Sequence, residues 1–327
     1  MSLSVDIEKK LGAFTLHSKF EAPDETMALL GASGCGKSMT LKCIAGIVTP
    51  DRGRIVLGDR VLFDSEKKIN LPPQQRKVGY LFQQYALFPN MSVEQNILCG
   101  IRSGDKAEKR RVLAEKIRMF RQQQRVALAR ILCSEPEAIL LDEPFSALDS
   151  YLKWNLEIEL ADLLATFNGP ILWVSHDRDE CYRNCRSVCV MENGRTGEVT
   201  PMDEMIRHPG SVSAAHLAGC KNFFAAEAKD GKVYLPEWNV SLLLPVTEKA
   251  FTTLGIPDNT VTLSESGGMA CTVCRMIPGV EENILLLRPE GSAEGAPMLR
   301  ITVGHESDLQ AGAAVRVALD QEKLLLL

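Results

Sequence analysis

Apolar residues in the first two hundred positions recur with two different spacings. Short, nearly continuous apolar runs are typical of buried strands, whereas apolar positions three and four residues apart are typical of one helix face. These patterns predict strands at 4–8, 14–20, 26–31, 53–57, 60–64, 78–82, 138–141 and 170–175. They predict helices at 37–45, 92–98, 105–133 and 150–167, and from 177 onward. Strands that alternate with helices favour an α/β fold, in which helices cover a mainly parallel sheet.

The pattern changes near Gly219. Beyond this point Gly, Pro and Asn separate many short strand-like runs, among them 232–235, 240–244, 284–287 and 314–319. Closely spaced strands with turn residues between them are typical of a small β-barrel or sandwich. We therefore expect an α/β domain over residues 1–220 and a β-rich domain over residues 221–327.

The overall composition is that of an ordinary globular protein, with 45% hydrophobic and 24% charged residues in a chain of 327. A net charge of −5 and a pI near 5.7 give no sign of a general nucleic-acid binder. No apolar run approaches the roughly 18 residues that a membrane-spanning helix needs. The first residues also lack the basic and apolar regions of a secretory signal. We expect a cytoplasmic protein, or one peripheral to the cytoplasmic face of a membrane.

The ten cysteines do not indicate a disulfide scaffold in such a compartment. Cys271 and Cys274 form a Cys-x-x-Cys pair in a strand-like stretch, without the second pair that a metal site usually has. Metal binding or redox chemistry at this pair remains the alternative. We interpret all ten as small apolar residues.

Residues 31–38 read Gly-Ala-Ser-Gly-Cys-Gly-Lys-Ser, which is the pattern of a phosphate-binding loop. Glycines permit the backbone angles and the close approach that such a loop needs. Successive N–H groups there form an anion-binding nest at the start of a helix. The predicted strand before this stretch and the predicted helix after it are the context that the motif requires. The residues assigned to phosphate binding are Gly31, Ser33, Gly34, Cys35, Gly36, Lys37, Ser38 and Met39.

Two stretches together supply the groups for nucleotide hydrolysis. In the loop, Lys37 would reach the β- and γ-phosphates, and the Ser38 hydroxyl would ligate Mg²⁺. Residues 138–144 read Ala-Ile-Leu-Leu-Asp-Glu-Pro, a buried strand that ends in two carboxylates. Asp142 would support Mg²⁺ on the Ser38 side. Glu143 would orient or deprotonate the attacking water.

Further motifs follow in the order found in one known family. Beside the two stretches above, they are Phe-Gln at 82–83, Gln-Gln-Gln-Arg-Val-Ala-Leu-Ala-Arg at 122–130, Ser-Ala-Leu-Asp at 146–149 and Trp-Val-Ser-His-Asp at 173–177. These resemble the Q-loop, the helix after the signature, the D-loop and the H-loop of ABC transporter nucleotide-binding subunits. The resemblance covers residues 1 to about 220. It implies a P-loop ATPase domain of the ABC type.

The resemblance implies ATP and Mg²⁺ as cofactors and gives roles to four more residues. Gln83 would sense Mg²⁺ and the attacking water, and His176 would contact the γ-phosphate beside Glu143. Asp149 would cross the interface between two such subunits. Phe14 would either stack on the adenine ring or be an ordinary core phenylalanine.

The C-terminal part is similar to importer subunits for molybdate, tungstate or sulfate. Residues 217–222 resemble the opening of their small β-barrel, the TOBE or Mop-like domain, and residues 315–327 resemble its close. The domain would bind a regulatory oxyanion or be a structural β-module. The resemblance implies a homodimer, or a heterodimer with another ABC ATPase subunit. Its partners would be membrane permease subunits and, indirectly, a periplasmic or extracellular oxyanion-binding protein.

The family signature Leu-Ser-Gly-Gly-Gln is missing from its expected place. The four positions before Gln122 are Arg118, Met119, Phe120 and Arg121, and neither glycine is present. The interval from Gln83 to Asp142 also looks short for the family, so the helical subdomain would be shortened. An in-frame loss of the signature segment explains both observations.

The loss has a specific physical consequence. In the family, each subunit offers its signature to the γ-phosphate held by the other subunit, through a serine, glycine amides and a helix N-terminus. A continuous helix over 106–130 would use its interior N–H groups internally. Arg118 and Arg121 would either replace the lost donors, like an arginine finger, or belong to a solvated basic face.

Three hypotheses therefore stand at this point. The first is an ABC import ATPase whose hydrolysis is weakened in the homodimer, or completed by a partner with an intact signature. The second is an ATP- or oxyanion-responsive regulator that does not hydrolyse ATP. The third, an ABC ATPase acting on nucleic acid, is disfavoured by the acidic charge and by the lack of coiled-coil or zinc insertions, so we expect no nucleic-acid partner.

Overall fold

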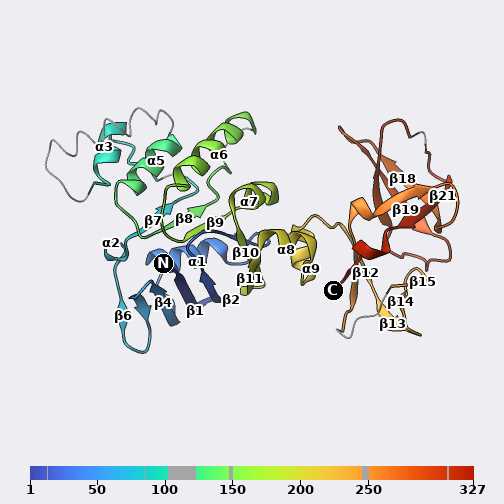
Figure 1. Ribbon diagram of the computed structural model, residues 1–327, viewed down its shortest axis with the longest axis horizontal. Coiled ribbons are helices and arrows are strands. Elements are labelled where there is room, and N and C mark those ends of the chain that lie inside the picture. Colours follow the sequence, from blue (N-terminus) through green and yellow to red (C-terminus); the bar gives the residue numbers. More distant parts are fainter. Residues whose placement is uncertain (13, 85, 102–122, 147–149, 245–249, 308) are drawn as a thin grey trace. The chain divides into compact units, whose positions relative to one another are not determined.

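The computed structural model describes residues 1–327 except 13, 85, 102–122, 147–149, 245–249 and 308 (Figure 1). The chain divides into two compact units, Met1–Asp203 and Glu204–Leu327. This division precedes the domain boundary that we expect at 220.

The first unit is built on one sheet to which eleven strands of the described residues contribute, in the order β6-β5-β4-β1-β2-β11-β10-β3-β9-β8-β7. The strands are β1 (Leu3–Leu11), β2 (Phe14–Ala22), β3 (Thr26–Leu30), β4 (Arg52–Leu57), β5 (Arg60–Asp64), β6 (Ile69–Asn70), β7 (Val78–Leu81), β8 (Ala138–Asp142), β9 (Ile171–Val174), β10 (Ser187–Glu192) and β11 (Arg195–Pro201). The edge formed by β6, β5, β4, β1 and β2 is antiparallel. The remainder is mainly parallel, as the alternation of strands and helices predicts.

The parallel strands end together at one edge of the sheet. β7, β8, β9, β3 and β10 pair in parallel, and the register sets Val174 of β9 opposite both Asp142 of β8 and Leu29 of β3. The segments that leave the carboxyl ends of these strands are therefore neighbours in space. In open α/β sheets this edge is where ligands bind.

Helices connect the parallel strands (Figure 1). They are α1 (Lys37–Ala45), α2 (Pro73–Arg76), α3 (Val93–Leu98), α5 (Gln123–Leu132), α6 (Ser150–Leu164) and α7 (Arg178–Asn184). The structure confirms α1 at its predicted bounds, and α3 begins with a capping box in which Ser92 and Gln95 exchange hydrogen bonds. Of the helix expected over 105–133, the described residues include α5, over 123–132. α6 ends at Leu164, three residues before the predicted end at 167.

A buried arginine ties the end of α1 to the strands beside it. Arg76 is fully buried, and its guanidinium donates 2.8 Å hydrogen bonds to the carbonyls of Cys43 and Ile44 and to the side chain of Asn70. The last carbonyls of a helix have no partner within it, so these bonds cap α1. The arginine thus fixes the helix that begins at the phosphate-binding loop.

The second unit is rich in short antiparallel strands, as the sequence predicts. They form sheets in the orders β12-β16-β22, β13-β14-β15 and β17-β21-β18-β19-β20. The strands are β12 (Asn222–Ala225), β13 (Glu227–Lys229), β14 (Lys232–Leu235), β15 (Val240–Leu242), β16 (Thr253–Ile256), β17 (Val261–Ser264), β18 (Met269–Ile277), β19 (Asn283–Pro289), β20 (Leu299–Val303), β21 (Ala314–Leu319) and β22 (Leu325–Leu326). Two short helices that the sequence reading missed precede them, α8 (Met202–Arg207) and α9 (Val212–Leu217).

Buried polar groups of the second unit bond to one another. Asn222 donates to the carbonyls of Ile256 and Arg300 and accepts a 2.8 Å hydrogen bond from the Arg300 N–H. The guanidinium of Arg300 pairs with Asp258. These bonds join β12, β16 and β20 around a core that contains Trp238.

Candidate active site

The phosphate-binding loop follows β3 and requires glycine at two positions. Gly31 has a φ of +155°, and a Cβ there would lie 2.2 Å from the carbonyl oxygen of Met191. Gly36 has a φ of +114°, and a Cβ there would lie 2.6 Å from the Leu16 side chain. Because L-residues rarely adopt these angles, a side chain at either position would displace the loop.

The loop leads directly into the start of α1. Gly36 is the N-cap residue of this helix, and no side chain caps it. The helix start therefore keeps N–H groups and a positive dipole end for an anion. Lys37 is buried, and its ammonium donates to the carbonyls of Gly31 (2.7 Å) and Ala32 (3.0 Å). These contacts hold the cation against the loop.

Two of the three side chains expected to bind the metal, those of Ser38 and Asp142, lie together, whereas the third, that of Gln83, contacts Glu143. The Ser38 hydroxyl donates a 2.7 Å hydrogen bond to Oδ1 of Asp142, across 104 residues of sequence. Tyr80 of β7 donates a 2.7 Å hydrogen bond to Oδ2 of the same carboxylate. Hydroxyl and carboxylate oxygens are ligands that Mg²⁺ prefers. The donor set therefore fits a magnesium ion.

The three residues assigned to catalysis also meet. Oε2 of Glu143 lies 3.4 Å from Nε2 of Gln83 and 3.5 Å from Nδ1 of His176. Glu143 has a φ of +49°, which is uncommon for a residue other than glycine. Its carboxylate is one-quarter exposed, so it can reach a water molecule. The sequence motifs thus converge on one group of side chains.

The segment that carries His176 is anchored by Lys153, a residue that the sequence reading missed. Asp177 caps α7 by accepting the N–H groups of Asp179 and Glu180. Lys153 of α6 donates to Asp177 and, at 2.9 Å, to Glu180. Burial lowers the pKa of Lys153, but these hydrogen bonds outweigh burial and raise it overall. Burial raises the pKa of Asp177, but the bonds from Lys153 and the helix N–H groups lower it overall.

The remaining predicted residues fall into three groups. Ser33 and Gly34 are exposed on the loop, Cys35 is buried within it, and Met39 packs against the core. The ring of Phe14 lies 3.7 Å from the position of a Cβ on Gly36, and it also packs against the core. Both interpretations of Phe14 therefore remain. Asp149, Arg118, Met119, Phe120 and Arg121 lie outside the described residues.

Tyr80 and Lys153 are the residues near the site that the sequence reading missed. A tyrosine that interrupts an otherwise apolar strand next to the acidic strand could have signalled a buried hydrogen bond. Lys153 lies in α6, and nothing in its sequence surroundings points to Asp177. Both residues depend on contacts between distant parts of the chain.

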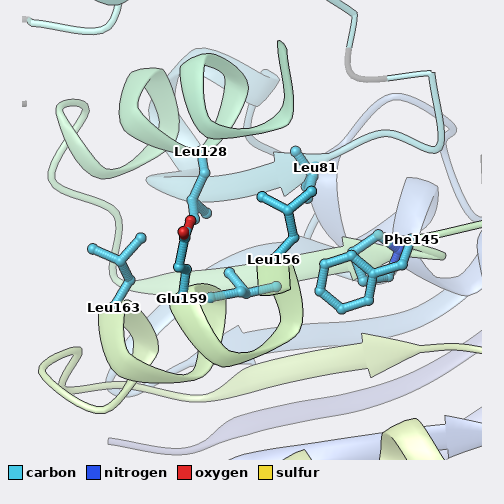
Figure 2. Close-up of a pocket in the computed structure, with 8 residues that line it drawn as sticks. Leu81, Leu128, Phe145, Leu156, Glu159 and Leu163 are labelled. Atoms are coloured by element: carbon cyan, nitrogen blue, oxygen red, sulfur yellow. The ribbon is translucent and has the colours of Figure 1, made fainter. Parts of the chain in front are cut away.

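A small, mainly apolar pocket, whose lining includes Leu81, Pro144 and Glu159, lies between α5, α6 and the turn after β8 (Figure 2). Its volume of about 30 Å³ leaves room for one or two water molecules. Leu128 and Leu156 face each other across it, and Phe145 closes one end (Figure 2). We interpret the pocket as a packing gap beneath α5.

Thiols do not form a metal site in the part of the chain that the structure describes. No three His, Cys, Asp or Glu side chains there are arranged to hold a metal ion. All ten cysteines are free, and Cys271 and Cys274 lie within β18, with Cys271 buried. Among the described residues, no helix is both long and apolar enough to span a membrane.

The chain is similar to known proteins. The profile of the family described as ABC transporter matches residues 18–146. A molybdate/tungstate import ATP-binding protein, WtpC of Archaeoglobus fulgidus, is 41% identical over 67% of this chain and 95% of its own. A molybdenum import ATP-binding protein, ModC of Paramagnetospirillum magneticum, is 34% identical over 64% of this chain and 61% of its own. The chain thus spans about three-fifths of that relative.

Other relatives carry different names. A spermidine/putrescine import ATP-binding protein of Methylococcus capsulatus and an Fe(3+) ions import ATP-binding protein of Haemophilus influenzae are both 37% identical to this chain.

The solved structure of MJ0796, a bacterial ABC transporter cassette, matches 62% of this chain and 99% of its own, with a TM-score of 0.52 and 23% identity. This similarity shows the fold. The ordered motifs and the match to WtpC, of which the chain covers 95%, establish that the chain belongs to the ABC transporter family as an ATP-binding subunit.

Proposed function

We propose that this chain binds ATP with Mg²⁺ and hydrolyses it as the energising subunit of an importer. The observation that carries the proposal is the convergence of Ser38 with Asp142 and of Gln83 with His176 around Glu143. Lys37 and the N-terminus of α1 would hold the phosphates. Mg²⁺ would neutralise phosphate charge, and Ser38, Asp142 and Gln83 are the residues that would hold it.

In the proposed reaction, Glu143 accepts a proton from the attacking water or orients it. Its carboxylate lies at the carboxyl end of β8, and Gln83 and His176 lie against the same oxygen. A positioned general base contributes about 10² to 10⁴-fold in rate. His176, with two-thirds of its side chain exposed, is free to meet the γ-phosphate.

We also propose that the cargo is an oxyanion such as molybdate, tungstate or sulfate. The names of the WtpC and ModC relatives support this choice. The competing cargoes are polyamines and Fe(3+) ions, which appear in the names of two other relatives. The test is uptake of radiolabelled anion, polyamine or iron by cells that produce the chain or lack it. Loss of molybdate, tungstate or sulfate uptake alone would support an oxyanion cargo, and loss of polyamine or iron uptake would contradict it.

The proposed assembly is a dimer at the cytoplasmic face of a membrane. Two such subunits, or this subunit and another ABC ATPase, would bind permease subunits that an oxyanion-binding protein supplies. Affinity purification from cells, with the bound proteins identified by mass spectrometry, tests the assembly. Recovery of the chain without a permease would contradict it.

In this proposal, residues 221–327 of the second unit form a structural β-module. Two grooves on the described surface of this unit share Glu290, and one of them is also lined by Glu265 and Arg316. Two carboxylates beside one guanidinium do not favour a bound anion. A rise in the melting temperature of the full chain with molybdate, tungstate or sulfate would instead support a regulatory oxyanion site.

The missing signature favours a second candidate function, a regulator that binds ATP without hydrolysing it. Losing preorganised donors to the γ-phosphate typically costs about 10² to 10³ in rate. Parallel measurement of ATP binding and phosphate release by the purified chain separates the two functions. Turnover that Glu143→Gln abolishes supports the ATPase. Tight binding with turnover no higher than that of the variant supports the regulator, provided that a co-purified ABC ATPase subunit with an intact signature does not restore turnover.

A further inference from the structure

Tyr80 joins two strands at the point where the metal would bind. It pairs with Leu140 in the register of β7 and β8, and its hydroxyl reaches Asp142 at the end of β8. The O–H donates a 2.7 Å hydrogen bond to Oδ2, while Oδ1 accepts the hydrogen bond from Ser38. Each oxygen of this carboxylate is therefore held by its own donor.

The surroundings keep this hydrogen bond in one arrangement. Tyr80 is 8% exposed and Asp142 is 6% exposed. A tyrosine phenol is protonated at physiological pH, so it donates its O–H to this carboxylate. The Tyr80 and Phe82 rings also pack together, with centroids 4.3 Å apart. Because Phe82 precedes Gln83, this contact extends to the segment that carries the catalytic amide.

We propose that Tyr80 is a positioning residue for the metal site. By occupying Oδ2 of Asp142, it directs Oδ1 toward Ser38, where Mg²⁺ would be held. This inference rests on the proposed function, since it concerns the metal of the same reaction. Residues that orient metal ligands typically contribute about 10- to 100-fold to metal affinity. Tyr80 therefore acts on metal binding without itself touching the metal.

The test is Tyr80→Phe in the full chain, which keeps the ring and its contact with Phe82 and removes only the hydroxyl. The background is Glu143→Gln, so that bound ATP is not consumed. The readout is the dissociation constant of Mn²⁺, a spectroscopic substitute for Mg²⁺, from the complex with ATP, measured by electron paramagnetic resonance. We expect Tyr80→Phe to raise this constant about tenfold and to leave ATP affinity in EDTA unchanged.

Tyr234→Phe is the matched control. The Tyr234 hydroxyl donates a 3.0 Å hydrogen bond to Asn239 in the second unit, and its loss should leave Mn²⁺ binding unchanged. A double-mutant cycle with Asp142→Asn then asks whether Tyr80 acts through this carboxylate. We expect Tyr80→Phe to weaken Mn²⁺ binding no further in the Asp142→Asn background.

Three outcomes would overturn the inference. An unchanged Mn²⁺ constant in Tyr80→Phe would show that the hydroxyl does not position the site. Equal losses of ATP affinity with and without metal would show a general structural role. Additive effects in the cycle would show that Tyr80 acts by another route. If the Glu143→Gln parent, with Tyr80 intact, binds no ATP, the proposed function itself fails, which is a distinguishable result.

Discussion

The two units of this chain use their strands differently. In the first unit, parallel strands end at a common edge, and Lys37, Ser38, Asp142, Glu143 and His176 all lie in segments that leave this edge. In the second unit, antiparallel strands place their ends on different sides, and buried polar groups such as those around Asn222 satisfy one another. Parallel topology thus brings reactive groups from distant segments together. In the antiparallel unit, by contrast, the buried polar groups bond to one another and stabilise the fold.

Charge follows the same division. The second unit, Glu204–Leu327, holds 15 acidic and 10 basic residues, which accounts for the whole net charge of −5. The first unit, which would bind the polyanionic nucleotide, carries no net charge. This contrast supports nucleotide binding in the first unit and a structural role for the second.

The largest expected effect comes from Lys37→Ala. Removing a buried, hydrogen-bonded charge from a binding site costs about 2 to 5 kcal/mol. We therefore expect ATP affinity to fall on the order of 10³-fold, with the second unit still folded. Titration with a fluorescent ATP analogue measures the first effect, and circular dichroism checks the second. Retained affinity would place the nucleotide elsewhere.

Lys153→Met tests the anchor of the segment that carries His176. The substitution leaves Asp177 and Glu180 without their cation, and Glu180 is 2% exposed. Breaking a buried ion pair by removing one partner costs roughly 3 kcal/mol, so the first unit should melt several degrees lower. Calorimetry measures the shift. Lys42→Met, a change of the same type in α1, is the control.

Asn222→Ala provides the reverse test in the second unit. The amide bonds to the Ile256 and Arg300 backbones, and its removal leaves buried groups unpaired at a cost of about 2 kcal/mol. We expect a lower melting temperature of the second unit and unchanged ATP affinity. A loss of ATP affinity in this variant would contradict the division of roles.

A smaller effect concerns pH. The lowered pKa of Asp177 means that its pairing stabilises the fold above its ordinary value of 3.8 and is lost as pH falls through the lowered value. The raised pKa of Lys153 means that its contribution is lost only as pH rises above 10.5. The stability difference between wild type and Lys153→Met should therefore stay constant from about pH 5 to 9. A change within this range would show that the anchor depends on another titrating group.

Local patterns predicted much of the first unit. The helix that begins at Lys37, the cap at Ser92 and the cap at Asp177 follow from side-chain chemistry within a few residues. The partners of Tyr80 and Lys153 could not be predicted in this way. Their hydrogen bonds span 62 and 24 residues, and only the sheet register and helix packing bring them together.

In the second unit, too, local patterns predicted the strands but not which strands pair. Short strands separated by turn residues predicted its β character, and the strands at 232–235 and 314–319 have their expected bounds. The division into three sheets and the helices α8 and α9 were not predicted, because short apolar runs do not specify their partners. α9 did carry a signal, since Ser211 caps it.

The most direct test of the account is to restore the signature. In the four-residue variant Arg118→Leu, Met119→Ser, Phe120→Gly and Arg121→Gly, the stretch before Gln122 becomes Leu-Ser-Gly-Gly, and phosphate release is compared with wild type. Four alanines at the same positions are the control. The account predicts equal ATP binding in all three proteins and turnover on the order of 10² higher in the restored one alone. Turnover in wild type equal to that of the restored protein, and abolished by Glu143→Gln, would contradict it.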